Sequence, residues 1–103
     1  TVLNILAARL VDHANFIRKT IENSGKDLKM ANHLECAFGK WYQKDYDRYK
    51  HLKEYIAIDQ PHRRFHEAAA KLSKQCIVAN VDGVIDSSLE ILEAFIKLSE
   101  AIA

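Results

Sequence analysis

Residues 81–102 read VDGVIDSSLEILEAFIKLSEAI, and their apolar side chains recur every three or four positions, as on a helix. On a helical wheel they form two seams about a quarter-turn apart. The first seam contains Val81, Ile85, Leu89, Leu92 and Ile96, and the second contains Val84, Ile91, Phe95, Leu98 and Ile102. One seam is enough for the core of a bundle. The second keeps a spacing near 3.5 residues when Ser88 is counted, which predicts contact with a partner helix, either in a homodimer or on an attached domain. The alternative is a central helix that its own chain covers on both sides.

The whole chain has 103 residues, which allows one hydrophobic core, and we expect residues 1–103 to form a single domain. Three glycines and one proline leave long uninterrupted helical patterns, so the predicted fold is all-α. A net charge of +1 offers no general attraction for nucleic acid or a membrane surface. Without a signal peptide or an apolar run of about 20 residues, we expect a cytoplasmic protein. Because the chain starts at Thr1 rather than Met, we expect a fragment of a larger protein.

Two segments before residue 56 carry different helical patterns. The first has an apolar stripe that places His13 in the core, and its members are Leu3, Leu6, Leu10, His13, Ile17 and Ile21. The turn residues 23–27 end this helix, and we expect a loop to about Asn32. Residues 33–55 are rich in aromatic side chains and contain Gly39, which predicts a short, irregular helix. Either this helix bends near Gly39, or Cys36 and Trp41 face different neighbours.

Pro61 favours the first turn of another helix, with Asp59 or Gln60 near its N-cap. We expect this helix to end near Asn80, with a short break before the last segment. Its apolar stripe contains Phe65, Ala69, Leu72 and Cys76. Cys76 is therefore predicted to be a core residue.

Three histidines suggest a metal site. His62 and His66 are four residues apart on one helical face, within reach of a single ion, although such pairs also arise by chance. His13 interrupts an apolar stripe, and a buried imidazole needs a partner for each nitrogen. Three histidines and a thiol in one small bundle together indicate a tetrahedral zinc site.

The motif CAFGKWY at residues 36–42 lies between His13 and the motif PHRRFH at residues 61–66, and this order resembles the chemoreceptor zinc-binding (CZB) domain family. The resemblance implies a Zn²⁺ site formed by His13, Cys36, His62 and His66. It also implies a four-helix bundle with an additional short helix near residues 33–55, usually as a homodimer. Members of this family are regulatory domains of soluble bacterial chemoreceptors and of diguanylate cyclases.

Two further histidines lie outside this ligand pattern. His33, three residues before Cys36, either faces solvent, supports a ligand or substitutes for one. His51 lies among Tyr49, Lys50 and Lys53, as expected for a solvated face.

Four protein ligands leave zinc no open position for a substrate, so we expect no enzyme activity from this domain alone. HRRFH also lacks the Glu that follows the first His of a zinc-protease motif. Cys36 would be the one oxidisable ligand, and oxidation to a sulfenic acid would weaken its bond to the metal. The resemblance implies that such a cysteine-zinc switch senses hypochlorous acid, or zinc itself in the cyclases.

Two other hypotheses remain open from the sequence. The zinc could be purely structural and clamp a dimerisation module. A di-iron or haem bundle is more distant, because di-iron sites use paired Glu-x-x-His motifs that this sequence lacks.

Overall fold

The computed structural model describes residues 2–102, except for the side chains of Val2 and Leu3. Its helices are α1 (Val2–Glu22), α2 (Ala37–Lys44), α3 (Tyr46–Tyr49), α4 (Lys53–Ile56), α5 (Asp59–Lys74) and α6 (Val78–Ile102). No strand occurs within residues 2–102, so the all-α prediction is confirmed there. None of these helices has the length and hydropathy that a membrane span would require.

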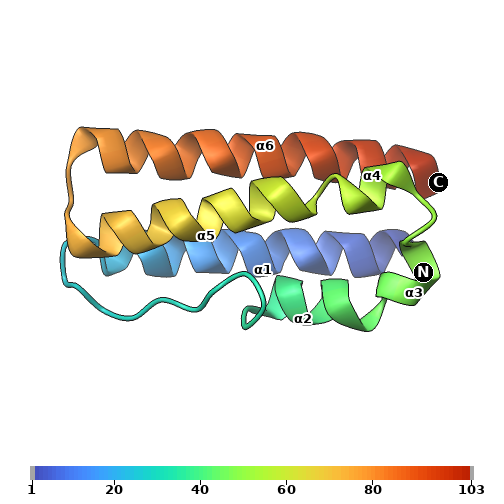
Figure 1. Ribbon diagram of the computed structural model, residues 1–103, viewed down its shortest axis with the longest axis horizontal. Helices are drawn as coiled ribbons and strands as arrows, with labels where there is room; N and C mark the ends of the chain where they lie inside the picture. The colour runs from blue at the N-terminus through green and yellow to red at the C-terminus, as the bar shows by residue number, and fades with distance from the viewer. Residues whose placement is uncertain (1, 103) are drawn as a thin grey trace.

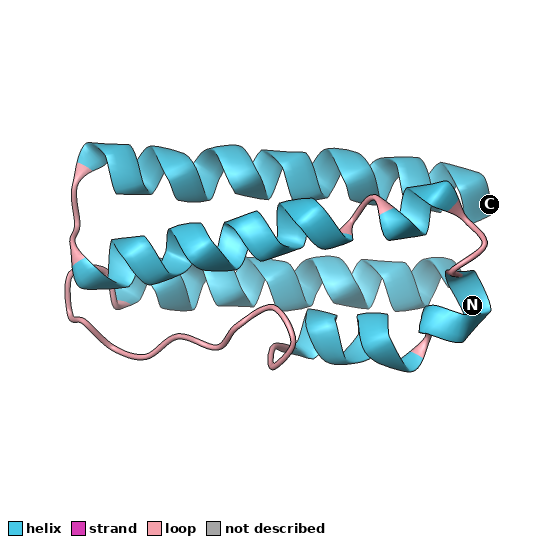
Figure 2. Cartoon of the chain, viewed as in Figure 1, coloured by secondary structure: helices cyan, strands magenta, loops and turns pink. Residues whose placement is uncertain are grey.

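The helices are arranged as an elongated bundle of 39 × 20 × 19 Å. The three long helices α1, α5 and α6 follow its long axis, α2 lies beside α1, and α3 follows α2 (Figure 1). The chain runs along α1, returns through α2 and α3, and then passes through α4 and α5 before α6 runs back. The loop over residues 23–36, pink in Figure 2, also runs along the bundle. Cys36 is the last residue of this loop and directly precedes α2.

Helix α1 ends as the turn residues predict, with Gly25 at a positive φ of 76°. The backbone N–H of Gly25 donates to the carbonyl of Leu72 (3.0 Å), which holds the turn against the end of α5. The predicted stripe is wrong at two positions, because the exposed fractions of Leu10 and Ile21 are 38% and 58%. The side chain of Leu3 lies outside the described residues. His13 is buried as predicted.

Helix α2 begins at Ala37, so the expected loop to about Asn32 extends to Cys36. Gly39 is needed here because the loop approaches the helix closely: a Cβ at this position would lie 1.8 Å from the carbonyl oxygen of His33. Cys36 has extended backbone angles and is the N-cap of α2. Cys36 thus precedes the helix that both alternatives assumed it to be part of. Its sulfur contacts His62, whereas the ring of Trp41 packs against Phe38, Tyr49 and Tyr55.

An aromatic cluster holds the short helices α2, α3 and α4 in place. Its buried members are Phe38, Trp41, Tyr49, Tyr55 and Phe95. Tyr42 stacks on Tyr55 with ring centres 4.3 Å apart, and each hydroxyl donates to the other residue's carbonyl. Helices of four to eight residues are unstable alone. Tertiary packing therefore determines the structure of residues 37–56.

The start of α5 agrees with the prediction, and its end does not. Its N-cap is Ile58, next to Asp59, and Pro61 lies in the first turn as expected. The helix ends at Lys74 instead of near Asn80, and the Asn80 side chain donates to the carbonyl of Gln75 (2.8 Å). Cys76 therefore lies in a loop and is exposed, so its prediction as a core residue is wrong. Asn80 belongs to α6, and its side-chain amide donates to the carbonyls of Lys71 and Gln75 at the end of α5.

The two seams of α6 have the reverse of their predicted roles. The seam of Val84, Ile91, Phe95 and Leu98 is buried within the chain's own core. The other seam is exposed, with exposed fractions of 51% for Ile85 and 54% for Leu89. The buried seam is the one whose side chains pack against α5 and the aromatic cluster. The exposed seam leaves an apolar stripe on the surface.

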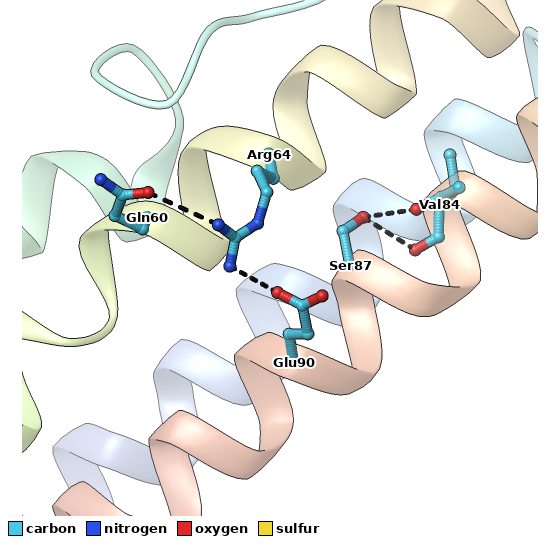
Figure 3. Close-up of polar contacts among 6 residues, drawn as sticks. Gln60, Arg64, Val84, Ser87 and Glu90 are labelled. Carbon is cyan, nitrogen blue, oxygen red and sulfur yellow. Dashed lines mark hydrogen bonds and ion pairs between the residues drawn. The ribbon is translucent and has the colours of Figure 1, made fainter.

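An ion pair joins α5 to α6 at the surface. Arg64 donates to Glu90 (2.6 Å) and to Gln60 (3.4 Å), while Ser87 bonds within α6 (Figure 3). Exposed pairs of this kind contribute about 0–1 kcal/mol, so burial rather than charge holds the two helices together.

Candidate metal centre

His62 and His66 lie one turn apart on the buried face of α5. Their rings are 4.8 Å apart, and their Nε2 atoms are 3.2 Å apart. Both side chains are buried, with exposed fractions of 4% and 6%. The i,i+4 spacing of one helix is therefore enough to aim both Nε2 atoms at one point.

Cys36 reaches the same point from the loop before α2. Its Sγ lies 3.3 Å from Nε2 of His62 and accepts the backbone N–H of Gly39 (3.2 Å). Ligand atoms of Cys36, His62 and His66 all lie within 4.8 Å of one another, and this is a metal-ligand cluster within the described residues. The sequence could not show this contact, because Cys36 and His62 belong to separate segments.

The loop before α2 also orients His66. Nδ1 of His66 is 2.7 Å from the carbonyl oxygen of Ala31. A carbonyl only accepts, so Nδ1 carries the proton and Nε2 keeps its lone pair toward Cys36 and His62. Ligating histidines typically donate their other N–H to a fixed acceptor in this way. No residue type in the sequence signals this backbone contact.

His13 lies beside the three-residue cluster but outside it. It is buried on α1, and its Nε2 is 2.9 Å from Oγ of Ser88 on α6. It shares a cavity of about 610 Å³ with Cys36, His62 and His66. The structure thus brings three of the four predicted ligands together and places the fourth on the wall of the same cavity. Ser88 was not singled out in the sequence as a residue of this site.

His33 and His51 differ in their relation to the site. His33 is partly buried, and its ring centre is 6.1 Å from that of His62. It therefore does not simply face solvent. It lies next to the cluster of Cys36, His62 and His66 but is not part of it. His51 is exposed, as predicted.

Burial keeps the three histidines neutral. It lowers the pKa of His13 from 6.5 to about 4 and that of His62 to about 3, and neighbouring histidines add to both shifts. Burial also lowers the pKa of His66, against its bond to Ala31. Neutral imidazoles are the form that binds a metal, so protons do not compete at neutral pH.

Burial acts in the opposite sense on the thiol. It raises the pKa of Cys36, although the backbone N–H groups at the start of α2 oppose the shift. The thiol alone is therefore protonated at neutral pH, and a positive ion is needed to hold it as a thiolate.

The donor atoms fit zinc. Zinc bonds of about 2.0 Å to nitrogen and 2.3 Å to sulfur separate tetrahedral ligands by roughly 3.3–3.6 Å. The Nε2–Nε2 distance of 3.2 Å and the Sγ–Nε2 distance of 3.3 Å within the cluster are close to this spacing. One thiolate among imidazoles is also a donor set that suits zinc better than magnesium or calcium.

Comparison with known proteins agrees with this donor set. The family model of the chemoreceptor zinc-binding domain matches residues 11–72, which include Cys36, His62, His66 and His13. No curated protein and no solved structure matches the chain. The match spans more than half of the sequence and confirms the resemblance carried by CAFGKWY and PHRRFH. The chain belongs to the chemoreceptor zinc-binding domain family.

Proposed function

We propose that this domain is the zinc-dependent sensory module of a bacterial signalling protein, either a chemoreceptor or a diguanylate cyclase. In this proposal His13, Cys36, His62 and His66 hold one Zn²⁺, and the module itself catalyses no reaction. The full protein would work in the cytoplasm and carry a separate output domain. The observation that supports a sensory role is the position of Cys36, whose sulfur faces His62 and also caps α2.

His13 completes the ligand set in this proposal. Its ring already lines the cavity that contains the other three side chains, and burial keeps it neutral. A ligand set drawn from α1, the loop before α2 and α5 would join three parts of the bundle. Four protein ligands would leave no position for a substrate, which is why we assign sensing rather than catalysis.

Zinc held at this site would supply the positive charge that keeps the sulfur of Cys36 deprotonated. The thiolate of Cys36 would attack the chlorine of hypochlorous acid and release hydroxide, and hydrolysis of the resulting sulfenyl chloride would give a sulfenic acid and chloride. The net step is RS⁻ + HOCl → RSOH + Cl⁻, in which sulfur loses two electrons and chlorine gains them. A sulfenic acid is a weak ligand, so Cys36 would leave the site while the three histidines remain.

The release of Cys36 from the metal would also change the start of helix α2. The same sulfur accepts the N–H of Gly39, so its displacement removes the cap of α2. Phe38, on the first turn of α2, has its ring 4.8 Å from His62 and 5.7 Å from Phe95 on α6. A shift of α2 would therefore reach α6 through Phe38. The two states of α2 are the switch in this proposal.

A purely structural zinc clamp in a dimerisation module is the second candidate. The exposed stripe of Ile85, Leu89, Leu92 and Ile96 on α6 favours a homodimer. A structural clamp would keep its zinc under oxidation, whereas a sensor would release or loosen it. The two candidates therefore differ in one measurable property.

The deciding experiment is a titration of the zinc-loaded wild type with hypochlorous acid. Zinc transfer to a colorimetric chelator, helicity by circular dichroism and Trp41 fluorescence are recorded at each equivalent. The sensor hypothesis expects all three signals to change at about one equivalent and to recover with a thiol reductant. Unchanged zinc retention and unchanged fluorescence at that dose would reject it in favour of the clamp.

A further inference from the structure

A buried hydroxyl on α6 faces the histidine of α1. Ser88 has an exposed fraction of 8% and His13 one of 6%, and the Oγ to Nε2 distance is 2.9 Å. Leaving either group unpaired in the core would be costly, so the contact fixes the orientation of the His13 ring. Ser88 lies outside residues 11–72, the part of the chain that the family model matches.

The anchors of His13 and His66 use opposite ring nitrogens. His66 is held by Nδ1 on the carbonyl of Ala31, which leaves Nε2 for a metal. Nε2 of His62 also faces the cluster, 3.3 Å from the sulfur of Cys36. In His13 it is Nε2 that is engaged, by Ser88, so only Nδ1 remains for a metal.

The tautomer of His13 follows from what zinc requires. A neutral imidazole carries one proton, and the nitrogen without it provides the lone pair. A serine hydroxyl can donate or accept, so Ser88 is compatible with either tautomer. Only the tautomer that donates Nε2–H to Ser88 frees the lone pair of Nδ1, and ligating histidines almost always donate their other N–H in this way.

We propose that Ser88 is a positioning residue for zinc binding: its Oγ accepts the Nε2–H of His13 and so presents Nδ1 of His13 to the metal. His62 and His66 bind through Nε2. This inference rests on the proposed four-ligand site. It also gives α6, which carries none of the four proposed ligands, a hydrogen bond to one of them.

The hydrogen bond between Ser88 and His13 lies close to the exposed apolar stripe of α6. Ser88 lies on the buried side of α6, one residue before Leu89 on the exposed apolar stripe. A change in the orientation of His13 acts on α6 at the turn that presents Leu89. The state of the zinc site is thereby linked to the surface that we assign to the dimer.

The first test compares zinc affinities by competition with a chromophoric chelator. Ser88→Ala should weaken zinc binding by about tenfold to hundredfold, the usual effect of losing such a support. Ser88→Thr, which keeps the hydroxyl, should restore affinity to near the wild-type value. Ser87→Ala is the matched control, because Ser87 is also buried but donates only to Gly83 and Val84 of its own helix. Circular dichroism establishes that each variant is folded.

The second test reads the tautomer directly. Long-range ¹H–¹⁵N spectra of the zinc-loaded wild type should show a protonated Nε2 and a metal-bound Nδ1 for His13. For His62 and His66 they should show a protonated Nδ1 and a metal-bound Nε2. A metal-bound Nε2 in His13, or unchanged or tighter zinc binding by Ser88→Ala, would overturn the role of Ser88 and leave the four-ligand site standing. If His13→Ala binds zinc as tightly as the wild type, the four-ligand site itself fails, and the inference fails with it.

Discussion

The sulfur of Cys36 lies 3.3 Å from Nε2 of His62, and it is also the side-chain cap of α2. One atom therefore belongs both to the candidate metal centre and to the start of a helix. His62 itself is fixed by α5 and by the ring of Phe38, 4.8 Å away. Any chemistry that moves the sulfur away from His62 must also alter how α2 begins.

The first prediction compares the two free cysteines, Cys36 and Cys76. Cys36→Ala should lose zinc to a mild chelator that leaves the wild type loaded, because it lacks one of the four proposed ligands. Removing the cap should also destabilise the domain by about 0.5–2 kcal/mol. Cys76→Ala, at an exposed position away from the cluster, should match the wild type in both respects. Elemental analysis after dialysis gives the zinc content, and equal retention by both variants would contradict the assignment of Cys36.

The glycines provide a second matched pair. Gly39→Ala should destabilise the fold by about 1–3 kcal/mol, because its Cβ would meet the backbone oxygen of His33 at 1.8 Å. Gly83→Ala should be neutral or stabilising by up to about 1 kcal/mol. Its Cβ would lie at an ordinary contact distance of 3.7 Å from the Cβ of Ala68, and alanine favours the helix in which Gly83 lies. Urea unfolding followed by circular dichroism measures both. A Gly39→Ala variant as stable as the wild type would show that the loop leaves room for a side chain at this position of α2.

Acid should destabilise the zinc-free domain through its buried histidines. Burial lowers the pKa of His13 to about 4 and that of His62 to about 3, below the value of 6.5 expected in the unfolded chain. Between these values the unfolded chain binds more protons, so the free energy of unfolding falls as the pH drops below about 6.5. The loss continues until the folded-state pKa values are reached.

Urea midpoints of the zinc-free protein at pH 7.5, 6.5 and 5.5 check this pH dependence. His51→Gln is the control, since it removes a histidine that is exposed rather than buried. A midpoint that stays constant from pH 7.5 to 5.5 would mean that the histidines are not buried as neutral groups.

The exposed stripe of α6 should mediate self-association. Leu89→Glu places a charge at the centre of this stripe and should shift a dimer toward monomers, because an unpaired charge is costly in an apolar interface. Lys97→Glu, also exposed on α6 but off the stripe, should leave the oligomeric state unchanged. Light scattering coupled to size-exclusion chromatography measures the mass. A monomeric wild type would remove the homodimer from the proposed function.

The fold shows which features local sequence determines. Helices were predictable because apolar spacing and the scarcity of glycine act within a single segment. The pairing of His62 with His66 was predictable for the same reason, since one turn of α5 sets their separation. The end of α5 was not predictable, because it involves contacts from outside the helix. The amide of Asn80 on α6 donates to the carbonyls of Lys71 and Gln75, and Cys76 lies exposed between the two helices.

Sequence alone determined an all-helical chain, the buried position of His13 and the residue types of a zinc site. Tertiary structure decided which seam of α6 is buried, because both seams are apolar enough to form a core and packing against α5 and the aromatic cluster distinguishes them. It also brought Cys36 to His62, across 26 residues, and Ser88 to His13, across 75. Periodicity along one helix fixes the direction of a side chain, whereas its partner depends on how separate segments meet in space.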